Sequence, residues 1–292
     1  MLLLVADGAA FGEATLRLGV FVAVFAVMAA AEALRPKRQL NHDKSRRWIT
    51  NLAIVAVDSA IVRLMGALAI PLVAVAAAVF AARSGWGLFN VLDWPWWLEW
   101  LIAILVLDLA IWFQHLVSHK MPMLWRLHRM HHADVDIDVT TAIRFHPIEI
   151  ALSMLWKIVC VLALGVAPEA VIIFEILLNA CAMFNHANVA LPEGVDRVLR
   201  QLIVTPDMHR VHHSVLQREH DSNYGFNLSV WDRMFGTYTA QPEAGHQGMT
   251  IGLTPYQSEA PTRLGWSLRL PFLPLGGAAT KDADTTLDRQ DD

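Results

Sequence analysis

Long apolar stretches separated by short polar segments dominate the first two thirds of the chain. They cover residues 15–34, 48–82, 97–117 and 148–184. A helix of about 20 apolar residues crosses the hydrocarbon core of a bilayer, so each stretch predicts at least one membrane helix. The segment GVAPE at 165–169 divides the last stretch, because glycine and proline end helices. We therefore expect two antiparallel helices there, joined by a turn.

The stretch 48–82 is too long for one simple span, and Asp58 and Arg63 interrupt it. We expect its later part to cross the membrane after an interfacial or tilted start. From about residue 192 onward the composition turns polar, as in a cap outside the bilayer. The pattern as a whole predicts an all-α polytopic membrane protein with about four to five transmembrane or hairpin helices and a cytosolic helical cap.

The segment between the first two apolar stretches indicates the orientation. It is strongly basic, with Arg35, Lys37, Arg38, Lys44, Arg46 and Arg47. Cytoplasmic loops are enriched in Lys and Arg, so this loop is expected inside and the first residues of the chain outside. The stretch 97–117 then returns to the cytoplasm, and the 148–184 hairpin leaves and returns once more. The N-terminal sequence lacks a basic region and a cleavage site, so we do not expect a signal peptide.

Composition supports a membrane protein and excludes other classes. Hydrophobic residues make up 55% of the chain and charged residues 17%, whereas soluble domains carry about 45–50% and about 25%. A net charge of −4 gives no reason to expect nucleic acid as a partner. Cys160 and Cys181 lie in apolar stretches without a CxxC pattern, so neither a disulfide framework nor a sulfur-based zinc site is expected.

Histidines occur in a repeated spacing. The chain has 13 of them, and the words HRMHH at 128–132 and HRVHH at 209–213 share one pattern. Residues i, i+3 and i+4 lie on one face of a helix, so each word would present three imidazoles together. HxxxH at 115–119 forms a third set, and two single histidines lie between the sets. The candidate metal ligands are His115, His119, His128, His131, His132, His146, His186, His209, His212 and His213.

Neutral imidazole is the commonest protein ligand for zinc, copper, iron and nickel. A structural zinc site needs four ligands, and the three sets alone supply twice that number. The count fits two adjacent metal ions with four or five nitrogens each. We expect His146 and His186 to be ligands or to support the ligands rather than to be ordinary polar histidines.

The three sets, in this order, resemble the histidine boxes of the fatty acid hydroxylase/sterol desaturase superfamily, which are integral-membrane di-iron oxygenases. The words LWRLHRMHH, RFHPIE, NHANV, DMHRVHHS and YGFNLSVWDRMFGTY also look like its bacterial members. The resemblance covers about residues 105–238. It implies ligand roles for the histidines of the three boxes and for His186. Some members have a further histidine where this chain has Ala190, so Asn188, His146 or a water is left to complete that coordination.

The resemblance implies two iron ions, cycling between Fe²⁺ and Fe³⁺, and O₂ as co-substrate. It implies hydroxylation or desaturation of a lipid of the sterol, fatty acyl, ether-lipid, carotenoid or aminolipid type, in the bacterial inner membrane with the boxes facing the cytoplasm. Residues 1–96 would form N-terminal membrane helices, 97–260 the catalytic domain and 261–292 a partly disordered tail. No nucleotide-binding or haem motif is present, so a separate ferredoxin, cytochrome or reductase would supply electrons.

Acidic residues near the boxes are candidates for supporting the ligands, since metal-bound imidazoles usually donate their other N–H to a carboxylate or carbonyl. Asp108, Glu149 and Asp207 are the leading candidates for catalytic support, followed by Glu175. Glu149 could equally cap a helix that begins at Pro147. A solvated face is expected for Asp134, Asp136 and Asp138, and cap packing for the aromatic run Tyr224, Phe226, Trp231, Phe235 and Tyr238.

Basic residues could dock an acidic electron donor or meet lipid headgroups. They are Arg126, Arg129, Arg144, Arg197, Arg200 and Arg210. Two alternative functions remain open, a membrane metal carrier or sensor without redox turnover and a zinc-dependent lipid hydrolase. Transporters place polar ligands at mid-bilayer, whereas these boxes fall at helix ends. A catalytic zinc needs only three protein ligands.

Overall fold

The computed structural model describes residues 2–68, 73–92 and 94–274, with side chains from Gly12 onward. Within these ranges the regular structure is helical, apart from isolated β-bridges and short 3₁₀ turns, which confirms the all-α prediction. The α-helices are α1 (Leu2–Leu34), α2 (Lys44–Leu68), α3 (Ala74–Ser84), α4 (Leu88–Val91), α5 (Trp96–Lys120), α6 (Pro122–His132), α7 (Pro147–Leu164), α8 (Pro168–His186), α9 (Glu193–Leu199), α10 (Pro206–His212), α11 (Gln217–His220), α12 (Val230–Met234), α13 (Gly245–Gly248) and α14 (Leu264–Arg269).

Six segments of the described chain are long and apolar enough to cross a membrane, somewhat more than the four to five expected. They are Gly12–Leu34, Lys44–Leu68, Ala74–Val91, Trp96–Lys120, Pro147–Leu164 and Pro168–His186. The polytopic helical architecture is therefore confirmed, and the chain is an integral membrane protein.

The stretch 48–82 accounts for the extra segment. Its first part belongs to α2, which is by itself long enough to cross a membrane, so the expectation that only the later part spans is wrong. The first turns of α2 bury Arg47, Asn51 and Ile54 against the cap. The first turns of α2 therefore pack against the cap.

A close backbone contact joins the far ends of two hairpins. α7 ends at Gly165, which has φ 71°, and α8 begins at Pro168, so the predicted hairpin within 148–184 is confirmed. The turn between α3 and α4 lies against it, where a Cβ on Gly87 would come within 2.2 Å of the Gly165 backbone nitrogen. Only glycine permits this approach together with the φ of 98° at Gly87.

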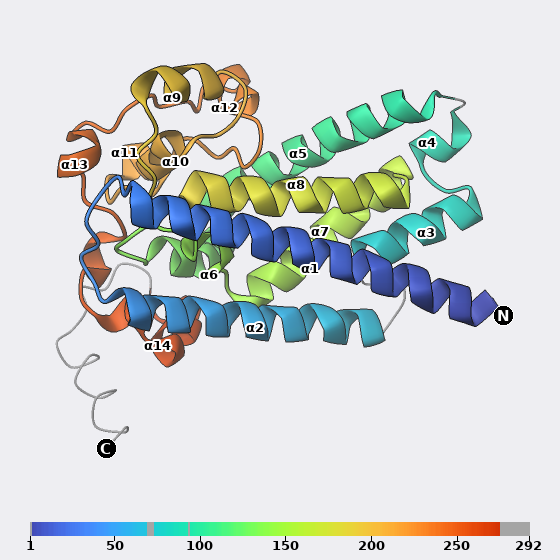
Figure 1. Ribbon diagram of the computed structural model, residues 1–292, viewed down its shortest axis with the longest axis horizontal. Helices are drawn as coiled ribbons and strands as arrows, with labels where there is room; N and C mark the ends of the chain where they lie inside the picture. Colours follow the sequence, from blue (N-terminus) through green and yellow to red (C-terminus); the bar gives the residue numbers. More distant parts are fainter. Residues whose placement is uncertain (1, 69–72, 93, 275–292) are drawn as a thin grey trace.

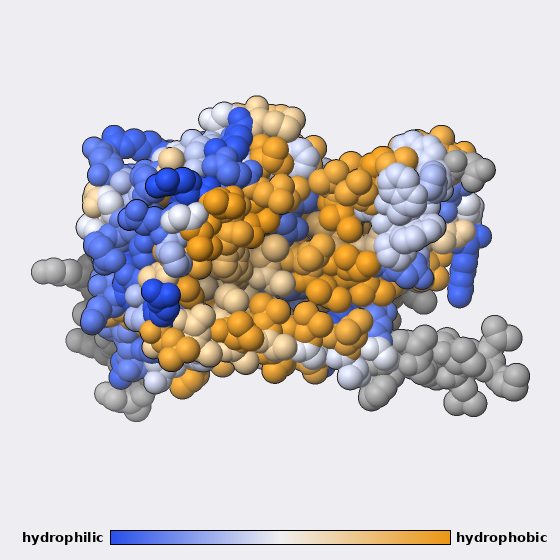
Figure 2. Space-filling view, turned by 45° about the horizontal axis from the view of Figure 1, so that its top comes forward, coloured by the Kyte–Doolittle hydropathy of each residue, from blue (hydrophilic) through white to orange (hydrophobic). Residues whose placement is uncertain are grey.

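The long helices lie along one axis and the short ones gather at one end. Figure 1 shows α1, α2, α5, α7 and α8 side by side, with α6 and α9 to α14 at the end where the last turns of α5 and α8 arrive. Figure 2 shows hydrophobic residues in a broad band over the long helices and hydrophilic residues over the short-helix end. We call that end the cap. A buried cluster including Leu107, Ile158 and Phe174 holds α5, α7 and α8 together.

The loop after the second box is buried, which contradicts the expected solvated face. Asp134, Asp136 and Asp138 are each at most 4% exposed. Arg47 on α2 donates through Nε and Nη2 to both oxygens of Asp134, at 2.8 Å each, and through Nη1 to Asp138 at 2.6 Å. The sequence could not show this, because Arg47 is more than 80 residues away and reaches the loop only through the tertiary fold.

The segment 261–274 also belongs to the cap rather than to a tail. Trp266 and Leu270 are buried in a cluster with Ile54 of α2 and Met130 of α6. Arg129 donates to the carbonyl oxygens of Leu270 and others nearby, which ties this segment to α6. The rest of the predicted tail, 275–292, lies outside the described residues.

Replacing Arg47 with alanine should destabilise the fold severely. The change leaves two buried carboxylates without their partner, a loss of about 3–5 kcal/mol for broken buried ion pairs. The thermal unfolding midpoint of the purified protein measures it. The adjacent Arg46 is exposed, so Arg46→Ala is the matched control and should leave the midpoint nearly unchanged. Equal midpoints for both variants would contradict a bracing role for Arg47.

Candidate metal centre

Four helices deliver the histidines to the cap end of the bundle. The last turns of α5 carry His115 and His119, and α8 ends at His186. α6 and α10 each begin with a proline in the first turn, and Thr205 caps α10 by accepting from the Met208 backbone N–H. α6 carries His128, His131 and His132, whereas α10 carries His209 and His212 and has His213 as its C-cap. The spacing predicted one cluster of three histidines from each word, but each word supplies histidines to two separate groups.

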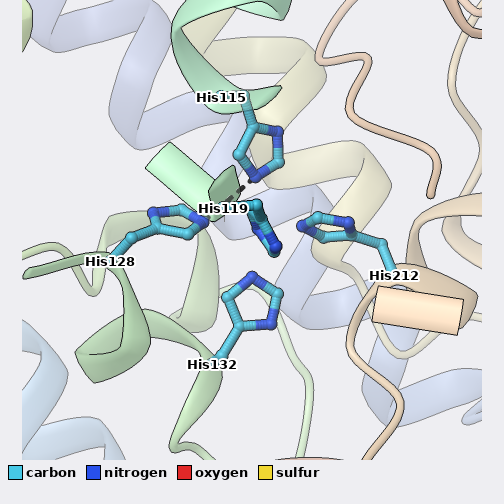
Figure 3. A group of neighbouring side chains, drawn as sticks. All are labelled: His115, His119, His128, His132 and His212. Carbon is cyan, nitrogen blue, oxygen red and sulfur yellow. Dashed lines mark hydrogen bonds between the residues drawn. The ribbon is translucent and has the colours of Figure 1, made fainter. Parts of the chain in front are cut away.

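Nine histidines converge into two groups. His115, His119, His128, His132 and His212 form the first, and His131, His186, His209 and His213 form the second. Within each group one nitrogen per ring lies within 4.8 Å of all the others. Figure 3 shows the five rings of the first group pointing toward a common centre. We call these the five-histidine group and the four-histidine group.

The two groups are direct neighbours. His131 and His132 are adjacent on α6 and belong to different groups, and the ring centroids of His132 and His213 are 4.6 Å apart in a stacked pair. Neighbouring residues on one helix thus feed both groups. The arrangement matches two adjacent metal ions, with five and four nitrogens available.

Hydrogen bonds on the outer side orient the rings. Nδ1 of five histidines faces an oxygen that can only accept, so Nδ1 carries the proton and Nε2 presents its lone pair inward. The partners are the Tyr224 carbonyl for His115 (2.8 Å), the Glu149 carboxylate for His128 (2.6 Å), the Arg144 carbonyl for His131 (3.2 Å), the Ala182 carbonyl for His186 (2.8 Å) and the Ser222 carbonyl for His212 (2.6 Å).

The inner nitrogens fit a metal and little else. Nε2 of His115 lies 3.1 Å from Nε2 of His128, and His186 and His131 face each other at the same distance. Lone pairs that point at each other repel unless a cation lies between them. Both nitrogens of His119, His132 and His213 are buried without a hydrogen-bond partner in the described structure. Such orphaned buried donors and acceptors are costly, and bound metal would satisfy one nitrogen of each of these rings.

Burial keeps the cap histidines in the form that binds metal. It lowers the pKa of each well below the ordinary imidazole range, and the neighbouring histidines lower it further. This holds for His131, His132, His209, His212 and His213. Neutral imidazole is the ligand form, so no proton has to leave these rings near neutral pH when a metal binds.

Two residues considered for completing the coordination lie elsewhere. The structure does not bring His146 into either group. It caps α7, accepting from the Ile148 N–H at Nδ1, and its Nε2 lies 3.2 Å from the Leu268 carbonyl. Asn188 bonds to the Arg38 backbone through both side-chain atoms. His186, in contrast, lies within the four-histidine group.

The acidic candidates separate by contact. Of these candidates, Glu149 accepts a hydrogen bond from a histidine of the two groups, namely His128. Asp108 accepts from the Trp231 indole at 2.8 Å and from the Leu228 backbone, so it holds the 224–232 segment to α5. Asp207 pairs with Arg210 and Lys37, and Glu175 with Lys157 and Arg17. Glu149 therefore supports a ligand directly, whereas the others brace helices.

The sequence did not predict several of the groups that orient the histidines. The carbonyls of Arg144, Ser222 and Tyr224 carry no sequence signal, since every residue has one. Asp232 is fully buried and accepts from the backbone N–H groups of Tyr224 and Gly225, which positions the carbonyl that orients His115. The aromatic run contributes cap packing as expected, for instance Phe235 stacked on Trp112 of α5, with centroids 4.6 Å apart.

A cavity of about 830 Å³ leads from the five-histidine group into the membrane part of the bundle. Residues of α1, α2, α5, α7 and α8 line it, and His115 and His128 form its cap end. Phe226, from the aromatic run, lines the cavity and lies 5.0 Å from the His115 ring. The volume falls in the range of pockets that hold small organic ligands.

The division into two groups predicts the metal content of variants. Replacing His119 and His132 together with alanine should lower bound metal from about two ions per chain to about one, because three nitrogens remain in the five-histidine group while the four-histidine group stays complete. His146→Ala is the control and should keep both ions. Inductively coupled plasma mass spectrometry of the purified proteins measures the ratio. Loss of metal in the His146 variant would contradict the division.

Protein stripped of metal should lose stability as the pH falls. The folded-state pKa of the cap histidines is lowered, so the unfolded chain takes up protons below about pH 6.5 while the folded chain does not. Stability is therefore present above that pH and lost beneath it. Unfolding midpoints at about pH 7.5 and about pH 5.5 test this. The metal-loaded protein should shift less, and an equal shift would contradict metal binding by these histidines.

Comparison with known proteins finds a family match over the part of the chain that carries the histidines. The fatty acid hydroxylase family model matches residues 100–237. Ornithine lipid hydroxylase OlsE of Rhizobium tropici is 26% identical over 80% of this chain and 70% of that protein. Alkylglycerol monooxygenases of Xenopus tropicalis and Homo sapiens are 30% and 32% identical over 59% and 58% of this chain, which spans only 38% and 37% of their lengths.

No solved structure matches the chain. The family model nevertheless encloses every histidine of the two groups, and the curated relatives named above modify lipids by hydroxylation or monooxygenation. The chain therefore carries a fatty acid hydroxylase domain at residues 100–237.

Proposed function

We propose that the protein is a membrane-bound di-iron oxygenase that hydroxylates an unactivated C–H bond of a lipid. One observation carries the proposal: two adjacent groups of five and four histidines lie at the end of a large cavity among membrane helices, and His115 and His128 of the five-histidine group line that cavity. Lipid oxygenation is the activity of the superfamily's relatives, and the cavity offers a path by which a membrane lipid reaches the histidines.

The surrounding residues orient the histidine rings and keep water away from the site. Glu149 and the backbone carbonyls of 144, 182, 222 and 224 fix the rings so that Nε2 points inward. Iron held by nitrogen ligands would supply the activation of O₂, while the protein supplies position and keeps water out. One oxygen atom enters the C–H bond, and the other leaves as water with two electrons and two protons. The five-histidine group meets the lipid cavity at His115 and His128.

The names of the relatives support hydroxylation rather than desaturation as the proposed reaction. OlsE is named for hydroxylation of an ornithine lipid, and the alkylglycerol monooxygenases for oxygenation of ether-linked glycerol. Both names describe lipids with a polar headgroup. We extend this to the present chain as its substrate class.

Electrons would come from a separate protein, and fewer arginines are free to dock it than the sequence suggested. Arg129, Arg144, Arg200 and Arg210 are each at most 6% exposed. Arg144, for instance, donates to Asn51, Pro261 and Ser267 within the cap. Arg126 and Arg197 alone of the six are accessible. We propose that the cap faces the cytoplasm, following the basic loop 35–47, which would expose it to a soluble donor.

The alternative functions fit less well. A catalytic zinc site uses three protein ligands and an open position, whereas these groups offer five and four nitrogens. A metal carrier would need a path for the ion, and the cavity lined by Ile111, Met154 and Phe226 is suited to lipid.

The proposed activity predicts a lipid product of increased mass. Purified protein loaded with ferrous iron, incubated with a membrane lipid extract and a reductant, should consume O₂ and add one oxygen atom to one lipid class. Mass spectrometry of the lipids detects it, and labelled O₂ traces the oxygen's source. His132→Ala should abolish the product, whereas His146→Ala should retain it. Lipid change without O₂ would overturn the proposal.

A further inference from the structure

The cavity holds two polar regions, and they differ in how their charges are paired. The region far from the histidines is neutralised internally, since Glu175 pairs with both Lys157 and Arg17, and Arg17 pairs also with Glu13. Lys157 lies eight residues beyond Glu149 on α7, about 12 Å along the helix. No charge there needs a ligand.

The region beside the histidines has carboxylates with free oxygens. Asp58 on α2 is 6% exposed and Glu149 on α7 is 9% exposed, and both line the cavity. Oδ1 of Asp58 and Oε2 of Glu149 are buried without a hydrogen-bond partner among the described residues. α2 and α7 pack against each other, and both carboxylates line the same cavity between these helices.

No arginine or lysine of the described chain forms an ion pair with either carboxylate. Glu149 uses its other oxygen on His128. Arg63 lies five residues after Asp58, about 140° around α2; it lines the same cavity, but its side chain is exposed and makes no ion pair with either carboxylate among the described residues. A buried carboxylate oxygen that has neither a cation nor a hydrogen-bond donor as partner is costly, and a ligand with donors would remove that cost.

We propose that Asp58 and Glu149 form a binding site for the ammonium headgroup of an aminolipid. This rests on the proposed lipid-oxygenating function. A primary ammonium has three donors and can bond both free oxygens at once. The apolar cavity beyond them, lined by Ile111, Met154 and Phe226 among others, accepts the chain.

The position of the pair along the membrane normal suits a headgroup. The first turns of α2 bond to the cap, where Arg47 reaches Asp134 and Asn51 bonds to Thr140. Asp58 lies two turns beyond Asn51, and Glu149 lies in the first turn of α7. Both carboxylates therefore lie near the boundary between cap and bilayer, where lipid headgroups reside. A small cation or soluble amine would not use the apolar part of the cavity.

Spin-label electron paramagnetic resonance tests the site without turnover. The metal-loaded protein is placed in phosphatidylcholine bilayers under argon with a long-chain primary amine that carries a nitroxide on its chain, or with the matching alcohol. The wild-type protein should bind the amine about tenfold or more tightly than the alcohol. Asp58→Asn should remove most of this preference and leave the alcohol's affinity unchanged.

The matched control is Asp43→Asn, which removes a carboxylate from the exposed start of the same helix and keeps an oxygen to cap it. It should retain the preference. The inference is overturned if the wild-type protein shows no preference, if Asp58→Asn weakens both probes equally, or if the control loses as much. Displacement of the lipid probe by millimolar ethylammonium would equally overturn a lipid site.

Two further readouts separate the inference from the proposed function. Asp58→Asn should unfold no earlier than wild type, because it removes an uncompensated buried charge. The binding experiment requires no O₂, so amine preference can hold while oxygenation fails. Conversely, oxygenation of neutral lipids with no amine preference would leave the proposed function intact and refute the site.

Discussion

Nine imidazoles buried within reach of one another are the constraint on which this structure depends. Each must stay neutral, point one nitrogen inward and find a partner for the other, in a place from which water is excluded. One helix can present two or three histidines on one face. Holding the histidines of α5, α6, α8 and α10 against one another requires a rigid structure around the ends of these helices. The cap is that structure, and its polar contacts are directed at the histidines' outer nitrogens or at the loops that carry them.

The membrane helices and the cap are joined by buried polar groups rather than by apolar packing alone. Arg47 links α2 to the loop after the second box. Glu32, near the end of α1, accepts from the backbone N–H groups of Val139 and Asn188. Each of these contacts connects a membrane helix to a segment next to a histidine set. Buried charges of this kind are costly unless paired, so they specify one arrangement of helix and cap.

The cavity follows from the same arrangement. Because α5 and α8 must end at the histidines while α2 is held to the cap, the five long helices enclose a space between them that opens at His115 and His128. At the end of the cavity far from the histidines, Glu175 is paired with Lys157, so its charge is neutralised. Asp58 and Glu149, in contrast, each keep an oxygen without a hydrogen-bond partner among the described residues. Glu149 is therefore shared between the ligand His128 and the cavity, which couples the metal site to whatever the cavity holds.

The sequence by itself determined the helical class, the hairpin at Gly165 and eight of the nine converging histidines from their spacing, with His186 added by resemblance. Periodicity reports which residues share one helix face, and that information is local. Tertiary structure alone decided that the histidines divide into five and four, that His146 caps α7 instead, and that Asp134, Asp136 and Asp138 are buried. It also decided that α2 is one continuous helix, Lys44–Leu68, whose first turns are bonded to the cap. These outcomes depend on partners such as Arg47 that are distant in the chain, and the spacing of residues carries no record of such partners.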